Sequence, residues 1–180
     1  MASPDRLTTN VQLSLFYYMR DELVSNGWLV SGTFSGTAQL LSAFPTDEDV
    51  ERIVTRDTAT GTGDEIILPV IAIDENNFLK RPTGIGGDDD ENHHQFLVMI
   101  FAEDDQQRRL LGNQIYNSLY EEDLDLDDFT GGFPPAVVPS GCGTIYLDNV
   151  VLSPFRVPGS PNVADRHRAN VIFDAVSYES

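Results

Sequence analysis

The chain has 180 residues, 41% of them hydrophobic, so we expect one globular domain with a substantial core. Its 29 acidic and 11 basic residues give a formal net charge of −18, which argues against direct recognition of DNA or RNA, because that recognition needs Lys and Arg to displace phosphate counterions. One cysteine excludes an intramolecular disulfide and a cysteine-rich zinc site, and no apolar run approaches the roughly 20 residues that cross a bilayer.

Residues 10–26 carry the pattern of an amphipathic helix. Thr9 and Gln12 match a Thr-x-x-Gln capping box, and Asn26-Gly27 supplies the usual left-handed stop. Apolar residues recur at every fourth position, which predicts one buried stripe formed by Val11, Leu15, Met19 and Leu23.

The next part of the chain carries weaker signals. Residues 28–30 and 37–41 are typical of short strands. Residues 46–54 fit either a short helix or the continuation of a hairpin, and 58–64 form a loop by composition.

Two apolar strands follow, joined by a long polar connection. Residues 66–73 predict the first, with Pro69 near its start or at an edge. Residues 80–93 form the connection. Residues 94–102 are apolar on both alternating faces, so we expect a central strand that is covered on both sides.

A second helix is predicted over residues 104–120. Asp104 with Gln107 three positions later is a variant of the capping box. The buried positions fall one above the other at four-residue steps, at Leu111, Ile115 and Leu119.

The last third of the chain contains two more strands. Residues 133–139 are too rich in proline for an interior strand, and 158–161 form a Pro/Gly loop. Residues 144–152 predict a strand with a bulge at Asp148-Asn149. Residues 169–175 alternate between apolar and other positions, which predicts a strand with one buried face formed by Ala169, Val171, Phe173 and Ala175.

This order of helix, strands, helix and strands predicts an α+β fold, with two helices packed on one mixed sheet. We expect a single domain over 1–180, with no internal repeat. Its core should come from the inner faces of the two helices and of the strands at 96–101 and 169–175. Outside these elements we expect an N-terminal arm at 1–8 and long loops or insertions at 31–64, 80–93 and 120–142.

No known reactive or metal-binding motif is complete in the sequence. Residues 123–128 resemble the start of an EF-hand, but Asp128 stands where glycine is needed and Pro134 where the closing glutamate is needed. The adjacent pair His93-His94 cannot easily share one tetrahedral metal centre. Cys142 is best explained as a small residue in a glycine turn. We therefore predict no catalytic residue, no metal and no cofactor.

Several segments together carry a family resemblance. A first helix is followed by the strand segment Pro69-Val70-Ile71-Ala72-Ile73 and by a connection with Arg81 and several glycines. The strand with Phe96-Leu97-Val98-Met99-Ile100, the helix with Gln107-Arg108-Arg109-Leu110-Leu111 and a final strand with Arg168-Ala169-Asn170-Val171-Ile172-Phe173 complete the layout. In the order of their elements and in their pattern of apolar and polar residues, residues 10–26 and 66–178 resemble the tail terminator (tail completion or neck) proteins of long-tailed bacteriophages.

The resemblance implies a small α+β domain that assembles as a homo-hexameric ring, caps the tail tube and joins it to the head. The implied partners are further copies of the chain, the tail tube protein and a head-completion or adaptor protein of the neck. DNA would pass through the ring without being specifically bound, and no membrane is involved. The N-terminus lacks the features of a signal peptide, so we expect assembly in the host cytoplasm and a final place in the virion, in the neck or tail.

Two acidic segments are the candidates for facing the DNA passage or a neighbouring subunit, because acidic walls repel phosphate. Their residues are Asp88, Asp89, Asp90, Glu91, Asp123, Asp125, Asp127 and Asp128. Solubility alone is a simpler explanation of the charge. The functional alternatives are another head–tail connector or tail tube component, or a small cytoplasmic enzyme or binding domain with a site assembled across loops.

Overall fold

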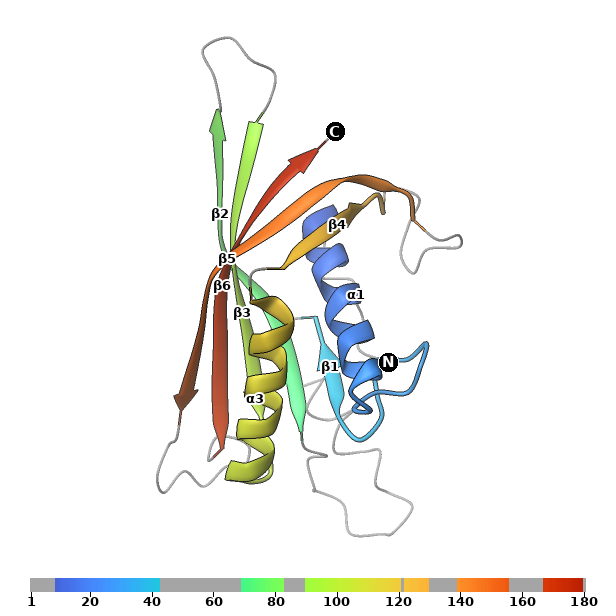
Figure 1. Ribbon diagram of the computed structural model, residues 1–180, viewed down its shortest axis with the longest axis vertical. Helices are drawn as coiled ribbons and strands as arrows, with labels where there is room; N and C mark the ends of the chain where they lie inside the picture. The colour runs from blue at the N-terminus through green and yellow to red at the C-terminus, as the bar shows by residue number, and fades with distance from the viewer. Residues whose placement is uncertain are drawn as a thin grey trace.

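The computed structural model of the chain describes residues 9–42, 69–82, 90–120, 122–129, 139–155 and 167–179. Within them the fold is α+β, as predicted: two helices cover one face of a six-stranded, strongly curled mixed sheet (Figure 1). Several predictions lie outside the described residues, namely those for 1–8, 46–54, 58–64, 84–87, 133–138 and 158–161.

Helix α1, Asn10–Ser25, begins with the predicted capping box. The Gln12 N–H donates to Thr9 Oγ1, and the Thr9 N–H donates to the Gln12 side chain, both at 3.3 Å. The helix ends at Asn26, and Gly27 follows with a φ of 79°. The predicted stripe is confirmed, because Val11, Leu15, Met19 and Leu23 are each 5% exposed or less.

The strands form one sheet in the order β1–β2–β3–β6–β5–β4. Strands β1 and β2 pair in parallel and all other neighbours pair antiparallel, so the mixed sheet is confirmed. Strand β3 lies between β2 and β6, as predicted for a central strand. The bounds are β1 Gln39–Leu41, β2 Val70–Pro82, β3 Asp90–Phe101, β4 Asp123–Asp127, β5 Gly141–Phe155 and β6 Arg168–Glu179.

The predicted bulge is present in β5. The register with β6 passes from Asp148 opposite Asp174 to Val151 opposite Ile172, so β5 carries one extra residue. Asn149 has a φ of 53° at this point. Before the bulge Ile145 and Leu147 point into the core, and after it Leu152 does.

Helix α3, Asp105–Leu119, covers the β5–β6 side of the sheet. Its cap is Asp104, whose Oδ1 accepts from the Gln107 N–H at 2.7 Å. The Gln107 side chain in turn accepts from the Glu103 N–H at 2.8 Å. At Gly112 an added Cβ would lie 3.2 Å from a methyl group of Leu152, so the helix approaches the sheet closely there.

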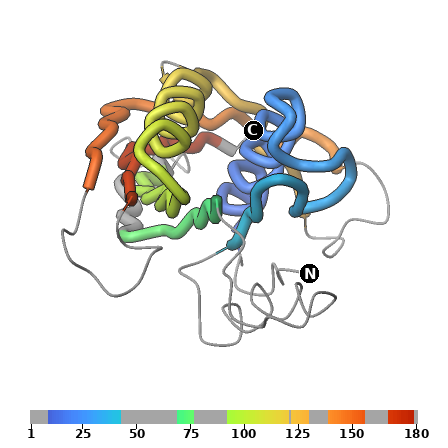
Figure 2. Tube along the Cα trace, turned by 90° about the horizontal axis from the view of Figure 1, so that it is seen from below, coloured from blue at the N-terminus to red at the C-terminus, as the bar shows by residue number. Residues whose placement is uncertain are grey.

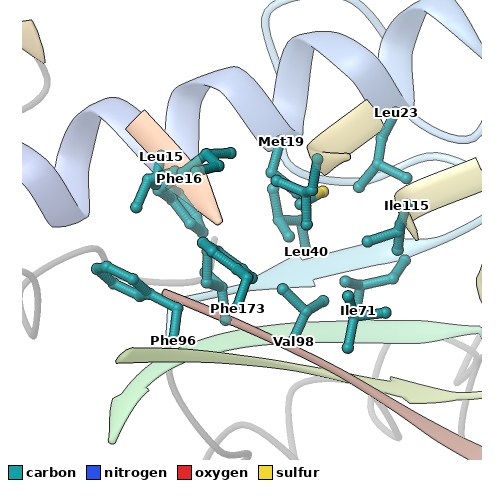
Figure 3. Close-up of a cluster of buried hydrophobic side chains, with 14 of the residues drawn as sticks. Leu15, Phe16, Met19, Leu23, Leu40, Ile71, Phe96, Val98, Ile115 and Phe173 are labelled. Carbon is teal, nitrogen blue, oxygen red and sulfur yellow. The ribbon is translucent and has the colours of Figure 1, made fainter. Parts of the chain in front are cut away.

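The two helices lie side by side over the sheet (Figure 2). Tyr18 on α1 donates its hydroxyl to the Ser118 carbonyl of α3 at 2.5 Å, and Trp28 Nε1 donates to Gln114 Oε1 at 2.7 Å. Beneath them the core side chains of both helices meet those of β1, β2, β3 and β6 (Figure 3). The predicted core is therefore confirmed.

Three local predictions are wrong. Residues 28–30 form no strand, and only an isolated bridge joins Leu29 to Gly36. Part of 80–93 belongs to a hairpin, in which Arg81 pairs with Glu91 and Leu79 with His93. Polar residues can continue an antiparallel pair past the core because main-chain hydrogen bonds do not require apolar side chains.

The third error concerns 120–142, where 123–127 form strand β4 at the sheet edge. Leu124 and Leu126 alternate with the acids and are 6% and 0% exposed. This period of two is the signature of a half-buried strand, and the acidic composition concealed it.

Candidate functional site

The predicted acids of the second segment form a row on strand β4. Asp123 and Asp125 are exposed and Asp127 is half-buried, whereas the leucines between them point into the core. We call Asp123, Asp125 and Asp127 the acidic row. Burial of Leu124 and Leu126 holds the row in place.

Helix α1 accepts hydrogen bonds from the main chain at one end of the acidic row. The Asp127 N–H donates to Ser14 Oγ at 2.9 Å, and the Phe129 N–H donates to Asn10 Oδ1 at 2.9 Å. Asp128 continues the chain, and its N–H donates to the Ser140 carbonyl at 2.9 Å. Partial burial, and secondarily the nearby charge of Asp125, raise the pKa of Asp127.

The first acidic segment lies at a different place. Asp90 and Glu91 begin β3 and pair with Pro82 and Arg81 of β2, while Asp88 and Asp89 lie outside the described residues. Strand β3 meets β6 only from Asn92 onward, so this hairpin end extends past its neighbour (Figure 1). We call the paired segments 77–82 and 90–93 the hairpin arm. Strands β6 and β5 separate β3 from the acidic row, so the sheet does not bring the two acidic segments together.

A buried polar cluster, which the sequence did not predict, lies under the first turn of α1. His94 Nδ1 lies 2.7 Å from Glu75 Oε1, and the two side chains are 3% and 13% exposed. Gln12 Nε2 also donates to the Glu75 carboxylate. The His94 ring stacks near Phe96 with centroids 6.0 Å apart. The cluster therefore joins α1, β2 and β3 through one carboxylate.

A histidine–carboxylate pair is the kind of group that moves protons in enzymes. Here the imidazole is 3% exposed and lies under a helix, so it is closed off from solvent. Its position fits a structural role, because a buried carboxylate is stabilised by donors and an adjacent imidazole.

The candidate residues include several types that can bind metal ions. Within the described residues, no group of three or more His, Cys, Asp or Glu side chains is arranged to hold a metal ion. Cys142 is half-buried within strand β5 and does not lie in the predicted glycine turn. None of the helices in the described ranges is long and apolar enough to span a bilayer.

The sequence matches no known protein-family model and no curated protein.

Proposed function

We propose that the chain is a subunit of a ring at the junction between head and tail of a long-tailed bacteriophage, in the role of a tail terminator. The observation that carries this proposal is that the sheet ends in two different, incompletely paired edges. Each subunit would offer one edge to the neighbour on one side and the other edge to the neighbour on the other side.

The first edge is the outer side of β2. Strand β1 pairs with β2 only from Val70 to Ala72, and among the described strands no other pairs with that side. In the antiparallel ladder with β3, alternate residues of β2 direct their N–H and C=O groups away from β3. Ten residues, Ile73 to Pro82, therefore continue as an edge strand.

The second edge is β4, at the opposite end of the sheet. The Leu147 N–H donates to the Glu122 carbonyl at 3.1 Å, which fixes the alternation of the ladder with β5. The main-chain groups of Asp123 and Asp125 therefore point away from β5. At Asp127 the outward N–H is already used by Ser14.

Contacts between unlike surfaces are heterologous and close into a ring when the rotation per subunit is right. Unpaired strand edges are natural places for such contacts. The resemblance to tail terminators supplies the expected hexamer and the expected partners, the tail tube protein and a head-completion or adaptor protein. The same proposal places the protein in the neck of the virion.

The acidic charge fits a passage for DNA. We infer that the acidic row of β4 does not line the passage, because it lies beside exposed tyrosines that a repelling wall does not need. The segment 88–91 then remains as the candidate that the sequence offers. Like charges also oppose ring closure. Salt should therefore favour assembly, since it screens charges over a Debye length of about 8 Å at physiological strength.

Native mass spectrometry and electron microscopy of the purified chain, at low and physiological salt, test this proposal. We expect a six-fold species that grows with salt, and rings in projection. Reversing the charges of 88–91 should impair DNA delivery in a tail-completion assay, with Glu103→Lys on an exposed loop as the matched control. A strict monomer at all salt concentrations and in the presence of tails would contradict the proposal. A ring that stacks into tubes would instead favour a tail tube component.

A further inference from the structure

The outer face of the sheet, opposite the two helices, is covered at one end and exposed at the other. Over β1, β2 and β3 a second apolar cluster is buried, with each member at most 6% exposed: Leu41, Val70, Ala72, Met99 and Phe101. Over β5 and β6 four large side chains are between 42% and 55% exposed: Tyr146, Val151, Phe155 and Tyr178. No helix or strand among the described residues covers this second half.

Strand register gathers tyrosines and acids at one end of the exposed half. Tyr146 lies between Asp123 of β4 and Val176 of β6, and the next pair on the same face is Thr144 with Tyr178. The two tyrosine rings meet edge to face, with centroids 5.6 Å apart. We call this surface the tyrosine face, formed by Asp123, Asp125, Tyr146, Asp148, Asp174, Val176 and Tyr178.

Among the residues that the structure describes, no Lys or Arg is paired with the carboxylates of the tyrosine face. Asp148 and Asp174 lie directly opposite each other, an arrangement of like charges that destabilises a sheet. Asp174 accepts from Gln95 Nε2 at 3.3 Å and from Asn149 Nδ2 at 2.9 Å, and Asp148 accepts from the Asn149 N–H at 2.7 Å. These donors are neutral amides. Among the described residues, no Lys or Arg forms an ion pair with any acid of this face.

Elsewhere in the chain, Arg20 shows how one guanidinium interacts with a tyrosine ring and a carboxylate together. Arg20 places its guanidinium 4.5 Å from the centroid of Tyr17 and donates from Nε to Asp21 at 2.7 Å. A planar guanidinium can stack on an aromatic ring and pair with a carboxylate at once, whereas a lysine ammonium is a compact, strongly hydrated charge.

We propose that the tyrosine face docks an arginine-containing segment of a partner protein. The negative charge of this face indicates which kind of partner can bind there. A second copy would bring a net charge of −18 and the same acids, and nucleic acid would bring phosphates. The inference goes beyond the ring proposal, because docking on this face requires no particular number of subunits.

The test is fluorescence anisotropy with the full chain and a labelled short peptide of alternating arginine and serine. The comparison peptides replace arginine by lysine or by glutamate. We expect the arginine peptide to bind best, and the double variant Tyr146→Ala/Tyr178→Ala to bind about tenfold more weakly. Asp148→Asn should weaken binding about threefold. Tyr146→Phe/Tyr178→Phe keeps the rings and should bind like the unmodified chain.

Two matched controls distinguish binding at the tyrosine face from non-specific attraction to an acidic protein. They are Tyr120→Ala, which changes an exposed tyrosine at the end of α3, and Glu103→Gln. Neither should change binding. Equal losses in the controls, equal binding of the arginine and lysine peptides, or unchanged binding by the double alanine variant would each overturn the proposal. Loss of self-association in that variant, without loss of peptide binding, would assign the face to a second copy. Ring formation is measured separately by native mass, so a failed ring leaves this result interpretable.

Discussion

The two faces of the sheet differ in how completely the chain covers them. The helix-covered face forms one apolar layer, in which Phe96 and Phe173 stack with centroids 5.5 Å apart. The outer face mixes buried apolar residues, opposed acids and exposed aromatics. Since both faces come from the same alternating strands, the comparison separates residues that determine the fold from residues that remain available to partners.

The largest effects should come from the helix-covered face. Leu15→Ala and Ile115→Ala remove side chains that are 1% and 2% exposed, and each should lower the free energy of unfolding by about 2–5 kcal/mol. Leu110→Ala, on the exposed side of α3 at 49% exposure, is the matched control and should change stability by less than about 0.5 kcal/mol. Urea denaturation followed by circular dichroism measures all three. Equal midpoints for the buried and exposed variants would show that the helix faces are misassigned.

The polar cluster is the place where the helix-covered face departs from an apolar layer. Glu75→Ala removes the acceptor that the buried His94 shares with the half-buried Gln12, so we expect the free energy of unfolding to fall by about 3 kcal/mol. Glu75→Gln keeps an amide oxygen at this position and should lose less. The same denaturation experiment ranks the two variants. If Glu75→Ala unfolds like the unmodified chain, the cluster contributes nothing to stability.

A smaller effect is expected at the start of α3. Asp104→Ala removes the acceptor for the Gln107 N–H and should lower stability by about 1 kcal/mol. Asp104→Asn can still cap the helix and should retain most of the stability. Thermal melts of both variants give the comparison, and equal melting temperatures for the two would argue against the cap.

The smallest effect concerns the acidic row and depends on pH. The pKa of Asp127 is raised above its ordinary value of 3.8, so folding favours the protonated carboxyl. The stability that this preference contributes is complete below that value and is lost as pH rises through the folded pKa. Asp127→Asn should therefore raise the melting temperature near neutral pH, and the gain should disappear in acid, where Asp127 is itself neutral. A gain that persists in acid would point to a cause other than charge.

Local patterns in the sequence predicted the elements whose signals are themselves local. The capping residues Thr9 and Asp104 and the four-residue steps of both helices were sufficient to place α1 and α3. The length of the β2–β3 hairpin was not predictable in this way, because its arm depends on pairing between polar segments far from the core. In β4 the alternation of leucine and aspartate is visible in the sequence, but the acidic composition of the segment is typical of a loop.

The same distinction between local signals and contacts distant in sequence applies to the candidate sites. The acids of the row were identified from sequence, although as a loop rather than a strand. The contact between Glu75 and His94 and the meeting of Tyr146 with Tyr178 depend on registers between segments distant in sequence. No single-sequence pattern encodes such registers, since a one-residue shift exchanges the faces of an entire strand.

The extra residue in β5 shifts the alternation of inward and outward side chains in the rest of that strand. Up to Asp148 the odd-numbered residues Ile145 and Leu147 point inward, and beyond the bulge it is the even-numbered Leu152 that packs near α3. Deleting Asn149 would remove the extra residue and leave Val151 outward and Leu152 inward, because both keep their partners on β6. A deletion or insertion beyond the bulge would instead exchange the two faces of the strand end. The end of this strand is therefore far more sensitive to a change in length than to a change in residue type.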